Sequence, residues 1–145
     1  MGQMLKRIAA ALLISIIFFA CCGDCSAKYK IVKINGVSFR LEIADTQEKR
    51  ESGLSGRILK DNEGMLFVFE SPCRPYFWMK GCPRPLDIVW VDESLKIIGV
   101  EKNAPVCTDG DCIVYRPTSK IKYVIELKGG TADDTGLAVG QKLEI

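Results

Sequence analysis

Histidine is absent from all 145 residues of the sequence. This absence excludes a Ser-His-Asp triad, a Cys-His dyad and every zinc site that needs an imidazole ligand. Acid–base chemistry would depend on Asp, Glu, Lys, Tyr or Cys side chains with shifted pKa values. Because no catalytic constellation stands out, the sequence favours a binding module over an enzyme.

The sequence also lacks a clear excess of charge of either sign. Removing Lys6, Arg7 and Asp24 with the first 27 residues reduces the 20 basic and 18 acidic side chains to 18 and 17. No basic block stands out, so a nucleic-acid partner is not expected. Asp109-Gly110-Asp111 lacks the EF-hand pattern, and we expect no cofactor.

The first 27 residues have the pattern of a secretory signal. Lys6 and Arg7 form a positive start, and the apolar run from Ile8 to Ala20 follows, with Ser15 as its one polar residue. That run is shorter than the roughly 20 residues that a membrane span needs. An uncleaved anchor helix is the alternative, but the pattern favours export.

Two processing sites fit this segment. Cys25-Ser26-Ala27 suits cleavage before Lys28, because small residues occupy the expected positions. Phe18-Phe19-Ala20-Cys21 is similar to a lipoprotein box in which Cys21 is lipidated. We therefore expect either a free periplasmic protein or a membrane-anchored lipoprotein, which meets the membrane only through this segment.

Four cysteines remain after the signal, and an even number in an exported chain predicts disulfides. The favoured pairs are Cys107–Cys112 and Cys73–Cys82, because each pair flanks a short segment that could turn back on itself. A four-cysteine zinc site is the rival interpretation, since C-x4-C lies within the usual ligand spacing. An oxidising compartment favours the disulfides.

The hydrophobic pattern of residues 28–145 predicts one mainly β domain. Asn35-Gly36 predicts the turn of a hairpin over residues 28–43. Asp45 and Gly53 suit the two ends of a short helix. The other predicted elements are strands at 65–69, 76–79, 86–91, 96–100, 123–127 and 143–145, and a helical turn at 131–135. The expected fold is a compact antiparallel β-sandwich or open barrel with one or two short helices.

Several motifs make the chain recognisable. They include Glu63-Gly64-Met65-Leu66-Phe67, Phe77-Trp78-Met79-Lys80, Pro85-Leu86-Asp87-Ile88 and Tyr123-Val124-Ile125-Glu126-Leu127. Together they closely resemble the uncharacterised bacterial and archaeal family named domain of unknown function 192. The resemblance implies a compact, mostly antiparallel β domain, often behind a signal peptide, and it implies no established activity.

Five residues are candidates for a pocket: Trp78, Lys80, Asp87, Arg57 and Glu126. Asp87 lies in an apolar strand, where a carboxylate must be paired or hydrogen-bonded to offset its burial. It is either a structural anchor or a functional acid with a shifted pKa. Phe77 and Trp78 point to opposite faces of a strand, so we expect one of them to be core and the other to be an exposed platform for a ligand or partner. Lys80 follows them at the end of the aromatic segment.

Three hypotheses follow. The leading one is an exported binding or accessory module whose partner is a small molecule, a peptide, a glycan or another envelope protein. The second is a hydrolase of envelope polymers that uses Asp87 and Glu126 as paired carboxylates. The third is a redox or zinc-binding role for the cysteines.

Overall fold

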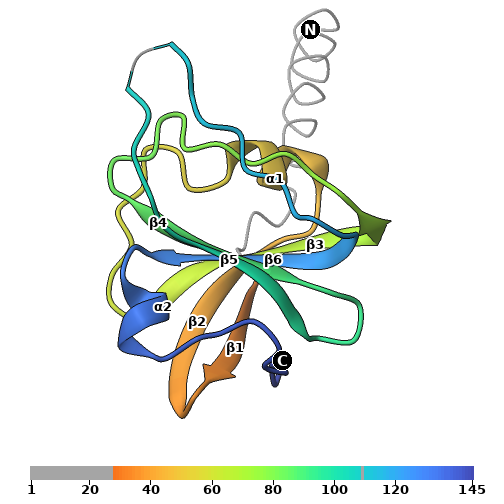
Figure 1. Cartoon of the computed structure of the whole chain (residues 1–145). Coiled ribbons are helices and arrows are strands. Elements are labelled where there is room, and N and C mark those ends of the chain that lie inside the picture. The colour runs from red at the N-terminus through yellow and green to blue at the C-terminus, as the bar shows by residue number, and fades with distance from the viewer. Residues whose placement is uncertain (1–27, 109) are drawn as a thin grey trace, which may run out of the picture.

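The computed structural model of the chain describes residues 28–108 and 110–145 (Figure 1). Its elements are β1 (Tyr29–Ile34), β2 (Val37–Ala44), α1 (Gln47–Ser52), β3 (Glu63–Cys73), β4 (Leu86–Val91), β5 (Ile97–Ala104), β6 (Ile121–Lys128) and α2 (Thr131–Asp134). The predicted signal segment and Cys21 lie outside the described residues. No helix within the described residues is long and apolar enough to span a membrane.

The six strands form one mixed sheet in the order β1-β2-β3-β6-β4-β5. Every neighbouring pair is antiparallel except β2 and β3, which run parallel because α1 and a loop connect them. The sheet is not closed into a barrel. The predicted mainly β class with two short helices is thus confirmed, in the form of a single open sheet.

Local sequence signals account for the first three elements. Asn35 and Gly36 both have positive φ, 48° and 86°, as a two-residue type I′ hairpin turn requires. The helix α1 begins one residue later than Asp45 predicts: Thr46 is its N-cap and accepts a hydrogen bond from the Lys49 amide. Gly53 ends α1, as predicted, with a φ of 47°.

The predicted strand at 76–79 is wrong. Phe77 and Lys80 make only isolated bridges, to Tyr115 and Cys107, within an otherwise irregular loop. The apolar run is nevertheless partly explained by packing, because Met79 is buried in the core. The prolines that flank the run restrict regular ladder pairing, since proline has no amide to donate.

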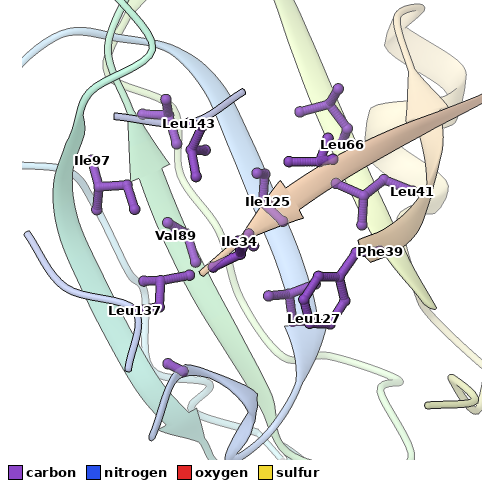
Figure 2. Packing of buried hydrophobic residues seen from close by; sticks show 13 residues of the cluster. Ile34, Phe39, Leu41, Leu66, Val89, Ile97, Ile125, Leu127, Leu137 and Leu143 are labelled. Atoms are coloured by element: carbon purple, nitrogen blue, oxygen red, sulfur yellow. The ribbon is translucent and has the colours of Figure 1, made fainter. Parts of the chain in front are cut away.

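One face of the sheet, here called the α2 face, holds the larger hydrophobic cluster (Figure 2). Side chains from all six strands meet there, and Ala132 of α2 and residues of the C-terminal segment cover them. The strand residues in this cluster are Val32, Ile34, Phe39, Leu41, Leu66, Val89, Val91, Ile97, Ile125 and Leu127.

The C-terminal segment, residues 137–145, hydrogen-bonds to both edges of the sheet. The Lys33 amide of β1 donates to the Glu144 carbonyl. At the other edge, the Ile97 amide of β5 donates to the Gln141 carbonyl, and the Leu143 amide donates to the Leu95 carbonyl. The segment makes bridges rather than the predicted full strand, and it covers backbone groups that an open edge would expose.

The opposite face, here called the α1 face, carries the second cluster. Met65, Phe67, Ile88 and Trp90 are among its buried members. Figure 1 shows α1 and the long loops on this side of the sheet and α2 on the other. These loops, residues 74–85 and 105–120, therefore replace a second sheet as the cover of the α1 face.

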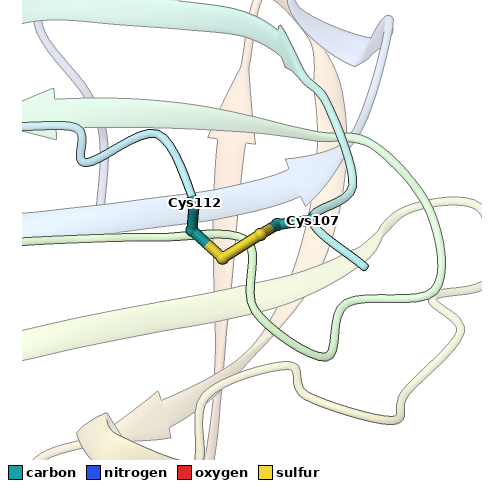
Figure 3. Close-up of a disulfide and its surroundings, with 2 residues drawn as sticks. All are labelled: Cys107 and Cys112. Carbon is teal, nitrogen blue, oxygen red and sulfur yellow. A yellow bond between two sulfur atoms is a disulfide. The ribbon is translucent and has the colours of Figure 1, made fainter. Parts of the chain in front are cut away.

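The disulfide Cys107–Cys112 closes a short turn in the second of these loops, as predicted (Figure 3). Because this bond consumes two of the four cysteines, the four-cysteine zinc site does not form. Within the described residues no group of three or more His, Cys, Asp or Glu side chains is placed to hold a metal ion.

The predicted Cys73–Cys82 disulfide is wrong, because both thiols are free. Cys73 ends β3 opposite Ile121, whereas Cys82 lies in the loop beside Glu126. Ile121 and Glu126 are five residues apart along β6, which corresponds to roughly 16 Å. The α-carbons of a disulfide lie within about 7 Å of each other, so sequence proximity misled the prediction.

Asp87 anchors the α2 face through its carboxylate. The side chain is fully buried, and it accepts hydrogen bonds from the amides of Asn103 at 2.7 Å, Gly130 at 3.2 Å and Ala132 at 2.7 Å. The N-cap of α2, Gly130, has no side chain to cap the helix. Asp87 supplies that cap from β4, which is the structural one of its two predicted roles.

We expect the substitution Asp87→Asn to lower the free energy of unfolding by about 2–4 kcal/mol. The amide group of asparagine would place N–H donors against backbone N–H groups and leave buried donors unpaired. Denaturant unfolding followed by circular dichroism would measure the loss. The matched control Asp133→Asn alters an exposed surface carboxylate and should change stability by less than about 0.5 kcal/mol. A change of that small size at Asp87 would contradict the anchoring role.

Candidate functional site

A pocket of about 240 Å³ opens on the α1 face of the sheet. Its walls come from α1, from the turn after α1, from β3 and β6, and from the loop at 75–82. The lining residues are Gln47, Arg50, Glu51, Ser52, Gly53, Leu54, Ser55, Phe67, Phe69, Pro75, Tyr76, Phe77, Trp78, Lys80, Cys82 and Glu126.

Glu126 supplies the buried carboxyl group of this pocket. Strand alternation turns it to the α1 face, between its cross-strand neighbours Met65 of β3 and Ile88 of β4. Gly64 allows β3 to approach closely, because a side chain there would collide with the Glu126 carbonyl oxygen. The carboxyl group of Glu126 thus lies between the apolar side chains of Met65 and Ile88 on the α1 face.

The carboxyl group of Glu126 has no compensating partner in the part of the chain that the structure describes. Only 5% of the residue is exposed, and among the described residues no hydrogen-bond or ion-pair partner contributes to its pKa, which burial alone shifts. Burial raises the pKa of Glu126 to about 8. The group is therefore mostly a neutral carboxylic acid at pH 7, and it can both donate and accept a hydrogen bond.

Aromatic rings form the walls around this carboxyl group. Phe67 and Phe77 pack edge to face with centroids 4.9 Å apart, and Phe77 packs the same way on Trp90 at 5.4 Å. Tyr76 and Trp78 extend the wall outward and are 60% and 55% exposed. The walls are thus rigid at the base and open to solvent at the mouth.

Charged and polar side chains line the mouth. Arg50 donates a hydrogen bond to the Val68 carbonyl at 2.9 Å and places its guanidinium 5.3 Å from the Phe69 ring centre. Gln47 donates to the Glu51 carboxylate at 2.8 Å, and Lys80 lies on the opposite loop. The mouth therefore carries both signs of charge, while the base carries only an acid.

Cys82 lies next to Glu126 in the pocket. Burial and the neighbouring Glu126 carboxyl raise the pKa of the Cys82 thiol to about 11. A thiol with this pKa is almost entirely protonated at neutral pH, so it is a poor nucleophile and a poor metal ligand. The geometry therefore gives Cys82 a packing role beside the carboxyl group.

The structure brings three of the five predicted pocket residues together. Trp78, Lys80 and Glu126 line the pocket. Arg57 lies outside it and pairs with the Glu42 carboxylate at 2.7 Å, and Asp87 faces α2. Arg50 and the rings of Phe67 and Phe77 also line the pocket and were not predicted to do so. The only signal for the two rings was the aromatic content of β3 and of the following loop.

Asp87 and Glu126 do not form a catalytic pair. Glu126 is directly opposite Ile88 across the β4–β6 ladder, and Asp87 is opposite Leu127. Because cross-strand partners point to the same face, the two carboxyl groups lie on opposite faces of the sheet. A glycoside-hydrolase mechanism needs two carboxyl groups on either side of one bond, and these two residues cannot provide that arrangement.

Comparisons with known proteins agree with the resemblance seen in the sequence. The model of the family DUF192, described as "Uncharacterized ACR", matches residues 30–145. A protein of unknown function from Novosphingobium aromaticivorans DSM 12444 shares 28% identity and a TM-score of 0.74, over 85% of this chain and 89% of that one. A putative transcription regulator from Sinorhizobium meliloti 1021 shares 27% identity and a TM-score of 0.75, over 84% and 97%. No curated protein matches the chain.

The raised pKa of Glu126 predicts a specific dependence of stability on pH. Between the ordinary value of 4.5 and about 8, the folded state keeps a proton that the unfolded state has released. The stability from this group is fully present below pH 4.5 and declines as the pH rises to about 8. Relative to Glu126→Gln, the wild type should therefore lose a few kcal/mol of unfolding free energy between pH 4.5 and pH 8.

Chemical denaturation of both proteins at several pH values would measure this difference. The exposed residue Glu48 on α1 offers a matched control. The substitution Glu48→Gln removes the same side-chain charge without touching the pocket. If wild type and Glu126→Gln showed parallel pH profiles, the carboxyl group would not be buried and protonated as the structure places it.

Proposed function

The chain belongs to the uncharacterised family DUF192, and from the geometry of this member we propose an exported cell-envelope module that binds a small molecule in the Glu126 pocket. One observation carries the proposal. The buried carboxyl group of Glu126 faces a pocket, and it has no hydrogen-bond or ion-pair partner among the described residues. Such a group costs stability, and proteins retain costly groups where they serve function.

The form of the pocket supports binding rather than catalysis. Its aromatic walls offer apolar contact area, and its few polar groups can orient a ligand, as in typical small-molecule sites. Asp87 lies on the other face of the sheet, and the Cys82 thiol is protonated. The second carboxylate in the pocket lining, Glu51, is on α1 and accepts a hydrogen bond from Gln47. The pocket thus offers contacts for a ligand and lacks the Asp87–Glu126 pair that the hydrolase hypothesis requires.

One feature of the sequence and one of the structure support the proposed cell-envelope location. The first 27 residues have the pattern of a secretory signal, with Cys21 as a possible lipid anchor. The disulfide Cys107–Cys112 suits an oxidising compartment. Both features fit a domain that works outside the cytoplasm, either free or tethered.

The description of the Sinorhizobium relative as a putative transcription regulator suggests a different role. Residues 28–145 do not favour that role, because they are close to electrical neutrality. A nucleic-acid-binding domain normally carries a marked basic excess. A small-molecule pocket accounts for the aromatic wall and for the buried Glu126 carboxyl group, which a nucleic-acid-binding role leaves unexplained.

The exposed ring of Trp78 provides a test of the proposed pocket. Screening the purified protein against a small-molecule fragment library by ligand-observed NMR should yield ligands. We expect the substitution Trp78→Ala to weaken those ligands about tenfold, because it removes one aromatic wall. Stability should change little, because the side chain is more than half exposed in the free protein.

The matched control is Ile58→Ala, which removes a large apolar side chain that is 65% exposed outside the pocket. It should leave ligand affinity unchanged. The proposal would fail if no fragment bound at millimolar concentration. It would also fail if Trp78→Ala and Ile58→Ala affected binding equally, since the ligands would then lie elsewhere.

A further inference from the structure

The surroundings of Glu126 indicate which chemical group a ligand presents to it. The cations nearest the pocket are engaged elsewhere or lie at its mouth: Arg50 bonds the Val68 carbonyl, and Lys80 is exposed. The other titratable groups that line the pocket are Glu51, which accepts a hydrogen bond from Gln47, the phenol of Tyr76 and the thiol of Cys82. The base of the pocket therefore has an acid and no counter-cation.

The walls next to this acid suit a positive charge. Phe67 and Phe77 both line the pocket and pack edge to face, which restricts how far either ring can turn when a ligand binds. Faces of aromatic rings attract cations, most strongly where water is excluded. Once Glu126 is ionised, its carboxylate repels an anion and attracts an ammonium group, whereas a neutral alcohol gains no such charge pairing.

We propose, on the basis of the pocket function argued above, that the ligand places an organic ammonium group between the Glu126 carboxylate and the aromatic walls. The ammonium would donate hydrogen bonds to the carboxylate and contact the rings. The part of the ligand at the mouth would meet Arg50 and Lys80, which suits a neutral or anionic end. The ligand class is thus an amine with an apolar segment next to its charge.

Binding of the ammonium group is coupled to the loss of one proton from Glu126. Glu126 releases its proton to solvent, and the ammonium keeps its own protons and pairs with the resulting carboxylate. Because the pKa of Glu126 is about 8, ammonium affinity should rise roughly tenfold per pH unit from pH 6 and level off above pH 8. The Cys82 thiol, with a pKa of about 11, stays protonated across this range.

Calorimetric titration of the full-length protein with butylammonium chloride at pH 6, 7, 8 and 9 tests the proposal. A probe of this size should bind with a dissociation constant on the order of 1 mM at pH 8. In parallel, 1-butanol is the neutral probe of the same length, and its affinity should not rise with pH. Buffers of different ionisation enthalpy should show release of one proton at pH 7 for butylammonium alone.

The variant Glu126→Gln separates this contact from a general loss of folding. It keeps the size of the side chain and removes the acid, so it should fold while binding butylammonium at least tenfold more weakly and without pH dependence. The control Glu48→Gln should bind like the wild type. Equal loss in both variants, or a butylammonium affinity that falls as the pH rises, would overturn the proposal.

The outcomes also distinguish this inference from the proposed function. If neutral fragments bind in a Trp78-dependent manner and butylammonium shows no preference over 1-butanol, the ammonium assignment is wrong and the pocket function stands. If neither probe nor any fragment binds, both proposals fail. Tetramethylammonium chloride, which cannot donate a hydrogen bond, separates the hydrogen bond to Glu126 from the contact of the cation with the rings. If it bound as tightly as butylammonium, the hydrogen-bonded pairing with Glu126 would be overturned.

Discussion

The packing of the α2 face depends on the three amide hydrogen bonds that the buried Asp87 carboxylate accepts. These bonds join β4 to the end of β5 and to the start of α2, where Asn103 and Gly130 both have positive φ. Without a fixed acceptor, two irregular chain turns would have buried amides with no partner. The Asp87 carboxylate thus holds three separate segments together, and the larger hydrophobic cluster packs against them.

A second buried carboxyl group, Glu126, lies on the neighbouring strand and points the other way. The two acids have opposite relations to their surroundings: Asp87 is saturated with amide donors, and Glu126 has none among the described residues. One group holds the fold together, and the other reduces its stability at neutral pH. The two carboxyl groups therefore lie on opposite faces of the sheet, one within a hydrogen-bonded network and the other at the pocket.

Much of the fold could be predicted from alternation and turn chemistry. The hairpin at Asn35-Gly36, the strand Leu86–Val91 and the two short helices follow from local patterns. Contacts between distant segments could not be predicted. The register that separates Asp87 from Glu126 and the distance between Cys73 and Cys82 are set by strand pairing. The pocket could therefore be predicted only in part. Alternation shows which face of the sheet a side chain takes, but it does not show which loop covers that face.

The contacts of residues 137–145 bear on how fast the domain can fold. Glu144 pairs with Lys33 of the first strand, and Gln141 pairs with Ile97 at the far edge, so this one segment covers both edges of the sheet. Contacts of such long sequence separation slow the search for the native state.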